Sequence, residues 1–142
     1  MTNRQMSDIV KDQKPLTLPT TATVKQACER MRDRRVGAVL VTDARGKLAG
    51  IFTGRDAVCR CLAEAKDAST VTLGDVMTRN PDTMPPGRTA IEALRLMQDG
   101  GFRHVPVIGR DGAIEGVVSR GDFRGLEQAR LDEETGLFER VY

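Results

Sequence analysis

The sequence predicts an α/β fold (mixed α+β) built from two tandem βαββα repeats that bury their apolar faces against each other. Residues 14–58 align with residues 80–124 at a constant offset of 66, without a gap, and 12 of the 45 aligned positions are identical. Each copy also ends on a hydroxyl and a carboxylate at the same spacing, Thr53 with Asp56 and Ser119 with Asp122. A repeated apolar pattern indicates a repeated fold, and the repeated polar pair indicates a ligand.

The first helix of each copy is predicted by apolar residues at helical spacing. In the first copy, Thr23 precedes a stripe at positions i, i+3, i+4 and i+7. Gln26 lies three residues after Thr23, as a capping box requires. Thr89 and Glu92 repeat the box in the second copy, where glycines 100 and 101 end the helix. The stripes consist of Val24, Ala27, Cys28 and Met31, then Ala90, Ala93, Leu94 and Met97.

A hairpin and a second helix follow in each copy. The apolar runs 36–41 and 48–52 flank a Gly-bearing turn, as do the runs 103–108 and 114–118. Asp56 and Asp122 begin the second helices, where a negative charge is favourable. The runs 15–18 and 81–84 are expected to be short edge strands. Residues 66–72 link the halves, 73–78 form one helical turn, and 125–142 form an amphipathic helix with an ordered tail.

Composition excludes several classes of function. The 142 residues suit one domain with two halves, and the net charge of +2 gives no basic footprint for nucleic acid. Four Phe, one Tyr and no Trp leave little for bases to stack on. The N-terminus lacks the apolar core of a signal peptide, and no stretch approaches the ~18 apolar residues of a membrane span. We expect a cytoplasmic protein with no membrane partner.

The chemistry-bearing residues predict no catalytic site. Cys28 is expected in the core, whereas Cys59 and Cys61 form a pair that lacks the second cluster of a metal site. Metal binding at that pair stays an alternative to a free, reduced state. The sequence has no dinucleotide fingerprint, no P-loop and no Ser–His or Cys–His arrangement, so we predict no enzyme, no catalytic cofactor and no metal.

The second copy strongly resembles a CBS domain, and the first resembles one in a weaker form. The residues that carry the resemblance are 76–81, 93–97, 103–107 and 116–122 in the second copy, and 50–56 in the first. The first copy has Leu40 where the second has Pro106, and it lacks the Met-Thr lead-in at Met77 and Thr78. The resemblance covers about residues 7–128, with CBS domains at 7–66 and 73–128 and a tail at 129–142.

The resemblance implies a CBS pair, or Bateman module, in which two repeats pack sheet to sheet with pseudo-twofold symmetry. Its two clefts would bind an adenine nucleotide such as AMP, ADP, ATP or NAD, or a related adenosyl ligand. Thr53 with Asp56, and Ser119 with Asp122, would hold the ribose hydroxyls through charge-assisted hydrogen bonds. The alternative is that both acids only cap helices and that Thr53 and Ser119 are turn residues.

Further contacts follow from the resemblance alone. Arg103 and His104 would meet phosphate at the Asp56 site, so that this site prefers phosphorylated ligands more than the Asp122 site does. Arg103 as a solvated charge, and His104 as a locally hydrogen-bonded residue, are the alternatives. The remaining adenine or phosphate contacts would be Thr17, Leu18, Gly37, Ala38, Ile51, Arg55, Thr83, Met84, Pro106, Val117 and Arg120.

The implied function is regulatory: an adenosyl ligand would shift the protein between conformations that an effector protein, not identified by the sequence, or a dimer interface reads. We expect a homodimer joined through helix faces that carry Val58, Leu62, Phe123 and Leu126. The alternative function is a ligand-free structural module that only mediates dimerisation.

Overall fold

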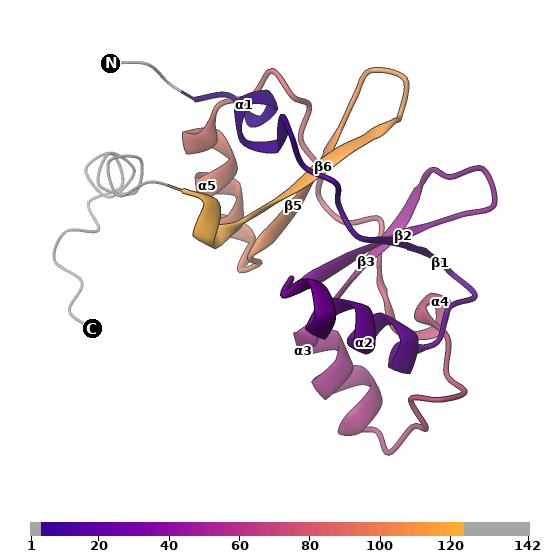
Figure 1. The fold of residues 1–142 in the computed structure, drawn as a ribbon. Helices are drawn as coiled ribbons and strands as arrows, with labels where there is room; N and C mark the ends of the chain where they lie inside the picture. Colours follow the sequence, from indigo (N-terminus) through magenta and orange to yellow (C-terminus); the bar gives the residue numbers. More distant parts are fainter. Residues whose placement is uncertain (1–3, 124–142) are drawn as a thin grey trace, which may run out of the picture. The chain divides into compact units, whose positions relative to one another are not determined.

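The structure, a computed structural model, describes residues 4–123 of the chain. These residues form two compact units (Figure 1). The N-repeat unit consists of Lys14–Asp82 with Gly112–Ile114, and the C-repeat unit consists of residues 4–13, 83–111 and 115–123. The expected C-terminal helix and the tail at 129–142 lie outside the described residues.

The N-repeat unit contains a four-stranded sheet with helices packed on it. The strand order is β1-β2-β3-β4, with β1 parallel to β2 and the other neighbours antiparallel. Its elements are β1 (Thr17–Pro19), α2 (Val24–Arg34), β2 (Ala38–Thr42), β3 (Leu48–Thr53), α3 (Gly54–Asp56), the π-helix η1 (Ala57–Leu62), α4 (Leu73–Val76) and β4 (Thr78–Arg79).

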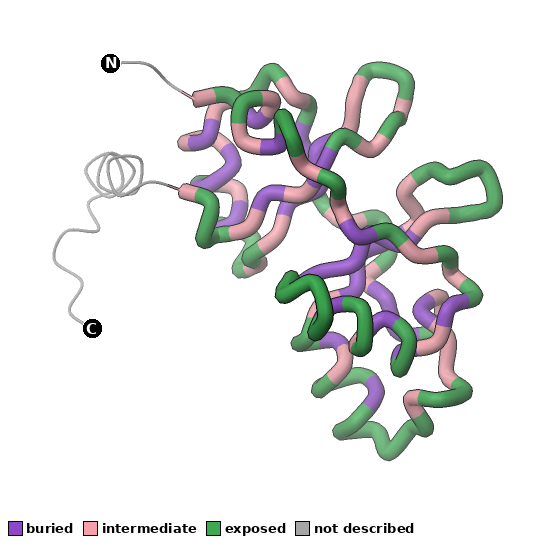
Figure 2. Tube along the Cα trace, viewed as in Figure 1, coloured by how far each residue is buried: buried purple, intermediate pink, exposed green. Residues whose placement is uncertain are grey.

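Local sequence sets the start of α2 and the burial of its inner face. The Thr23 amide donates to Gln26 Oε1 at 2.9 Å, and the Gln26 amide donates to Thr23 Oγ1 at 3.1 Å, which confirms the capping box. The apolar stripe of α2 packs on one face of the sheet, and Figure 2 shows buried residues along both elements. This core includes Val24, Ala27, Met31, Val39, Val41 and Phe52.

The C-repeat unit repeats this plan with a smaller sheet. Its elements are α1 (Met6–Val10), α5 (Ala90–Gly100), β5 (His104–Ile108), β6 (Ile114–Ser119) and the 3-10 helix η2 (Arg120–Asp122). Thr89 and Glu92 form the expected capping box, and Gly101 ends α5 at a φ of 72°. The expected strand at 81–84 is reduced to one parallel bridge between Met84 and Val107.

Each unit is completed by the short helix that precedes the other repeat in sequence. In the N-repeat unit, α4 binds back through Leu73 N to Ala22 O at 2.8 Å and Gly74 N to Thr20 O at 3.0 Å. In the C-repeat unit, α1 lies beside α5 (Figure 1), with Met6 N bonded to Arg88 O at 2.8 Å. The helix before the first repeat thus packs on the second repeat, and the helix before the second repeat packs on the first. The sequence did not predict this exchange.

Gly50 and Gly116, identical in the two repeats, make room for the exchanged segments. A Cβ at Gly50 would lie 2.6 Å from Met77 Sδ and from Thr78 O. A Cβ at Gly116 would lie 2.6 Å from Val10 Cβ. Neither position tolerates a side chain without movement of its neighbours, because real Cβ atoms do not approach so closely. The identity of these glycines therefore has a packing cause.

The outer edge of each hairpin is closed in a different way. In the N-repeat unit, β4 pairs with β3, with Thr78 opposite Ile51. In the C-repeat unit, the side chain of Gln13 pairs with the main chain of β6. Gln13 Nε2 donates to Val117 O at 2.9 Å, and Val117 N donates to Gln13 Oε1 at 2.6 Å. The Gln13 amide thus takes the place of a strand peptide.

The hairpins agree with prediction, but the helix after β3 does not begin where we expected. The N-cap is Thr53 and the first helical residue is Gly54, so that Asp56 occupies the third helical position. The next six residues form a π-helix, marked by a bond from Ala63 N to Val58 O at 2.8 Å. In the C-repeat unit, Ser119 and Asp122 hold the same two positions around η2.

Candidate ligand-binding site

Thr53 and Asp56 form a compact polar pair at the end of β3. The backbone amide of Thr53 donates to Asp56 Oδ2 at 3.0 Å, and its hydroxyl lies 3.4 Å from the same oxygen. The Asp56 amide in turn reaches Thr53 Oγ1 at 3.5 Å. Asp56 is only 8% exposed and is the one buried charged residue in the described part of the chain.

Ser119 and Asp122 repeat this geometry at the end of β6. The Ser119 amide donates to Asp122 Oδ2 at 2.7 Å, and the Ser119 hydroxyl donates to the same oxygen at 3.1 Å. Asp122 differs from Asp56 in its surroundings, because it is exposed. Arg4, from the segment before α1, donates through Nη2 to the main-chain oxygen of Asp122 at 2.9 Å.

The pairs offer a ligand mainly hydrogen-bond acceptors. An ionised carboxylate has about four lone-pair positions and no proton to donate. The capping contacts use Oδ2 in both acids, and the one proton of the neighbouring hydroxyl is directed at that oxygen. A group that donates, such as one hydroxyl of a vicinal diol, suits this arrangement. A phosphate oxygen, which only accepts, does not.

The two acids have different basic side chains beside them. Arg60, on η1, places Nε 3.6 Å from Asp56 Oδ1. Asp122 instead interacts electrostatically with His104, which begins β5 in the same unit. Burial lowers the pKa of His104 below its ordinary value, the Asp122 carboxylate opposes this shift, and the Arg103 charge adds to it. His104 is therefore predominantly neutral at pH 7.

The other predicted contact residues lie on the strands and their ends. Thr17 and Leu18 are in β1, with Thr17 exposed, and Thr83 and Met84 precede α5, with Met84 buried. Gly37 is exposed just before β2, where Ala38 is buried. Ile51, Pro106 and Val117 lie within β3, β5 and β6 respectively. Whether any of them touches a ligand stays a prediction.

Three arginines predicted to reach phosphate are exposed. Arg55 lies in α3, directly before Asp56, and Arg120 begins η2 directly after Ser119. Arg103 precedes β5, and its main-chain oxygen accepts from the Arg120 amide at 2.9 Å. Arg103 and Arg120 therefore lie at the same end of the β5–β6 hairpin as Asp122.

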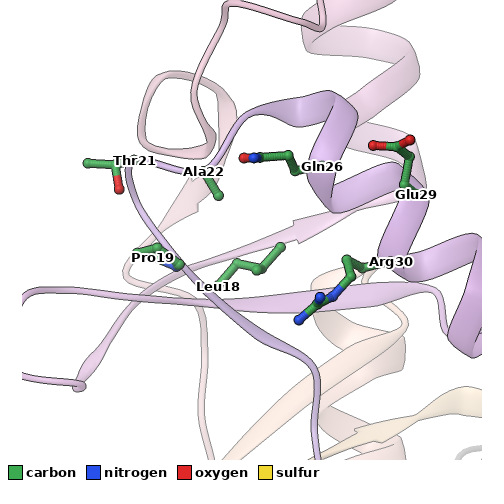
Figure 3. A pocket seen from close by; sticks show the side chains of 7 residues that line it. All are labelled: Leu18, Pro19, Thr21, Ala22, Gln26, Glu29 and Arg30. Atoms are coloured by element: carbon green, nitrogen blue, oxygen red, sulfur yellow. The ribbon is translucent and has the colours of Figure 1, made fainter.

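A pocket of about 600 Å³ lies beside α2 in the N-repeat unit. Figure 3 shows Arg30 extending from α2 toward Leu18, while Glu29 points the other way. Its lining residues are Leu18, Pro19, Thr21, Ala22, Gln26, Glu29 and Arg30. Leu18 is the one predicted contact residue among them, so this pocket does not contain the Thr53–Asp56 pair.

Sequence reasoning missed Arg60 and Arg4, the cations that contact the two acid-bearing segments. Arg60 stands four residues after Asp56, and an acid and a base at that spacing on a helix are neighbours, so the signal was present. Arg4 carried no such signal, because its contact spans 118 residues of sequence.

Two structural findings concern metals and membranes. Within residues 4–123, no cluster of three or more His, Cys, Asp or Glu side chains is placed to hold a metal ion. Cys61 is buried, Cys59 is exposed and Cys28 packs partly buried against the core. Across the same residues, no helix has both the length and the apolar character needed to cross a bilayer.

The chain belongs to the CBS domain family, whose sequence profile matches residues 6–61 and 73–127. It is 41% identical over 95 residues to the CBS domain-containing protein CBSCBSPB1 of Arabidopsis thaliana, covering 67% of this chain and 18% of that protein. The chain thus spans less than a fifth of the length of such relatives. The expected resemblance and the two-repeat α/β fold class are confirmed.

Solved structures of CBS domain proteins share the fold. The CBS domain protein PAE2072 from Pyrobaculum aerophilum, complexed with AMP, has a TM-score of 0.81 at 23% identity, covering 91% of this chain and 98% of that one. The CBS domain pair of protein MJ0100, in complex with 5′-methylthioadenosine and S-adenosyl-L-methionine, has a TM-score of 0.77 at 23% identity, covering 94% and 99%.

Proposed function

We propose that this chain is a regulatory module that binds an adenosyl ligand, such as AMP, and signals through a change of conformation. The observation that carries the proposal is the acceptor-rich hydroxyl–carboxylate pair, which occurs twice in one geometry, at the ends of β3 and β6. Two proteins of similar fold were solved in complex with AMP, and with 5′-methylthioadenosine and S-adenosyl-L-methionine, which supports an adenosyl ligand for this chain.

The chemistry of the pair favours the ribose as the group that it holds. The two vicinal hydroxyls of ribose can both donate to one carboxylate, and hydrogen bonds to a charged group contribute about 1.5–3 kcal/mol each. Phosphate would bind elsewhere, with the exposed Arg55, Arg103 or Arg120 as candidates, since guanidinium groups pair with phosphate oxygens. Binding one conformation better than another would then shift the population between them.

Deoxy analogues of AMP test this assignment with the unmodified protein. We expect AMP to raise the melting temperature, because a ligand that binds only the native state stabilises it by about 2.7 kcal/mol at a hundred times its dissociation constant. We expect 2′-deoxy-AMP and 3′-deoxy-AMP each to bind about ten- to a hundredfold more weakly, since each lacks one donor. Equal affinity for all three would contradict a ribose role.

A ligand panel separates the nucleotide from its relatives. The panel consists of AMP, ADP, ATP, NAD and S-adenosylmethionine, which share the adenosyl group and differ in the group attached to it. The ligand that raises the melting temperature most therefore indicates which class of ligand the protein binds. Turnover of any of them would indicate an enzyme rather than a regulatory module. CBS domains are generally regulatory, non-catalytic modules, which supports a regulatory role for this chain.

A ligand-free dimerisation module is the second candidate. It is favoured by two large apolar side chains on η1 that face solvent, Val58 at 55% and Leu62 at 75% exposed. The two candidates differ in one measurement, because a purely structural module shows no thermal shift with any ligand of the panel.

A further inference from the structure

Arg60 contacts both the Asp56 carboxylate and the segment that leads into the second repeat. Its Nε lies 3.6 Å from Asp56 Oδ1, and its Nη1 donates to Met77 O at 2.9 Å. The same Nη1 lies 3.4 Å from Val76 O. One guanidinium thus joins Asp56, at the end of α3, to the C-terminal end of α4.

The segment that Arg60 contacts is well defined. Val76 is 1% exposed and Met77 is 4% exposed, and the Met77 amide closes the last turn of α4 on Leu73 O at 2.8 Å. Directly after it, Thr78 and Arg79 form β4 on the edge of β3. The chain then continues into the second repeat. Any change in how Arg60 holds Met77 therefore acts on the segment that connects the repeats in sequence.

We propose that Arg60 is a positioning residue that couples ligand binding at Asp56 to the α4–β4 segment. The inference rests on the proposed function, since it assumes that a ligand hydroxyl donates a hydrogen bond to Asp56. At 3.6 Å the contact between Arg60 and Asp56 is a loose ion pair rather than a hydrogen bond. A ligand hydroxyl can therefore donate to Oδ1 while the bond from Arg60 Nη1 to Met77 O stays in place.

Ligand binding has a defined effect on this contact. A hydroxyl that donates to Oδ1 shares the carboxylate charge and weakens the attraction on Arg60 Nε. The guanidinium then moves toward the carbonyl oxygens of Val76 and Met77, of which the former is at the long end of hydrogen-bond distance. Occupancy of the Asp56 site thereby strengthens the C-terminal end of α4, and a firmer α4 strengthens ligand binding by the same factor.

The two repeats differ at this position. By the offset of 66, the position equivalent to Arg60 in the second repeat is Leu126, which carries no charge and lies outside the described residues. The coupling through an arginine is therefore a property of the Asp56 site. Ligand binding at the Asp56 site can therefore be measured separately, because Asp122→Asn weakens the second site and leaves Arg60 unchanged.

The test compares Arg60→Gln with its parent, both in an Asp122→Asn background. AMP binding is measured by calorimetry, and hydrogen exchange is measured at the amides of Met77 and Thr78 with and without AMP. The matched control is Arg45→Gln, which removes the same charge from an exposed turn at the other end of β3. Amides of Thr53 and Asp56 report that the ligand is bound.

In the parent and in Arg45→Gln, AMP should slow exchange at Met77 and Thr78 by about two- to fivefold, the range for strengthening one half-exposed charged contact. Arg60→Gln should still bind AMP, with affinity within about fivefold of the parent, but without the added protection. Arg60→Lys, which keeps a charged donor, should retain part of it.

Equal protection in Arg60→Gln and the parent would overturn the coupling while leaving the proposed function intact. Loss of the protection in Arg45→Gln as well, or its absence from an AMP-bound parent, would also overturn it. If the parent binds no adenosyl ligand at all, the proposed function fails and the coupling fails with it.

Discussion

Asp56 and Asp122 share their local geometry with two other aspartates, Asp8 and Asp75, which do not follow a hairpin strand. The capping box formed by Thr53 with Asp56, and by Ser119 with Asp122, recurs where Gln5 pairs with Asp8 at the start of α1. It recurs again where Thr72 pairs with Asp75 at the start of α4. The box is thus a general way to begin a helix, and the ligand role of Asp56 and Asp122 depends on their place at the strand ends.

His104 gives a pH dependence to the stability of the C-repeat unit. Burial is the main cause that lowers its pKa in the folded state, whereas the unfolded value is about 6.5. A lowered folded pKa stabilises the native state above the unfolded pKa, and that contribution is lost as the pH falls. We expect the free energy of unfolding to decrease from pH 7.5 to pH 5.5, measured by urea denaturation.

His104→Asn is the matching variant, since asparagine is polar and does not titrate. The difference in unfolding free energy between pH 7.5 and pH 5.5 should be smaller in this variant than in the parent, because the remaining acids titrate in both proteins. An equal pH dependence in the two proteins would show that His104 does not contribute.

At the scale of secondary structure, the sequence predicts elements that carry their own signals. The capping boxes and apolar stripes located α2 and α5, and the glycine-bearing turns located both hairpins. The sequence reasoning did not predict α1 and β4, because five residues and two residues are too short to show a period. Their apolar residues, such as Met6 and Val10, become buried only by packing against residues of the second repeat, which the sequence pattern does not show.

The exchange of α1 and α4 depends on Gly50 and Gly116. We expect Gly116→Ala to destabilise the protein by about 1–3 kcal/mol, the usual cost of overpacking, because the new methyl group would meet Val10. Gly50→Ala should act similarly through Met77 and Thr78. Urea denaturation gives the free energies. Gly87→Ala is the control, since a Cβ there meets nothing within 4 Å, and equal effects at Gly87 and Gly116 would contradict the packing argument.

The Gln13 side chain should stabilise the edge of β6 in a measurable way. Gln13→Ala removes both partners of the Val117 main chain and should cost about 1–3 kcal/mol of unfolding free energy. Native-state hydrogen exchange of the Val117 amide should rise in parallel. Lys11→Ala, at an exposed position in the same segment, should change neither quantity. An unchanged Val117 amide in Gln13→Ala would show that the side chain does not replace a strand.

At the scale of the whole molecule, the exposed apolar residues of η1 predict self-association. We expect a homodimer, because Val58 and Leu62 would otherwise leave apolar area in water, and a twofold interface buries the same patch on both chains. Val58→Asp with Leu62→Asp should give a folded monomer with the circular dichroism spectrum of the parent, as both side chains are exposed. Its melting temperature should be lower, because association no longer stabilises the native state. Light scattering at micromolar concentration measures the mass. A monomeric parent, with and without AMP, would contradict this expectation.

The candidate site was predictable in part. The spacing of Thr53 with Asp56, repeated at Ser119 and Asp122, is enough to locate both polar pairs in the sequence. Arg60 could have been located as well, because it lies four residues after Asp56, whereas the Arg4 contact with Asp122 joins distant segments. Position in sequence therefore identifies the acids and the partner of Asp56, and tertiary structure identifies Arg4 and the contact of Arg60 with Met77.

Calorimetry of AMP binding to a double variant tests the central claim most directly. Asp56→Asn with Asp122→Asn removes both negative charges, and the matched control, Asp8→Asn with Asp75→Asn, removes them from the same capping boxes at α1 and α4. We expect the first variant to lose about ten- to a hundredfold in affinity, the loss of charge-assisted bonds, and the control to bind as the parent does. Equal affinity of the first variant and the parent, or an equal loss in the control, would contradict the account.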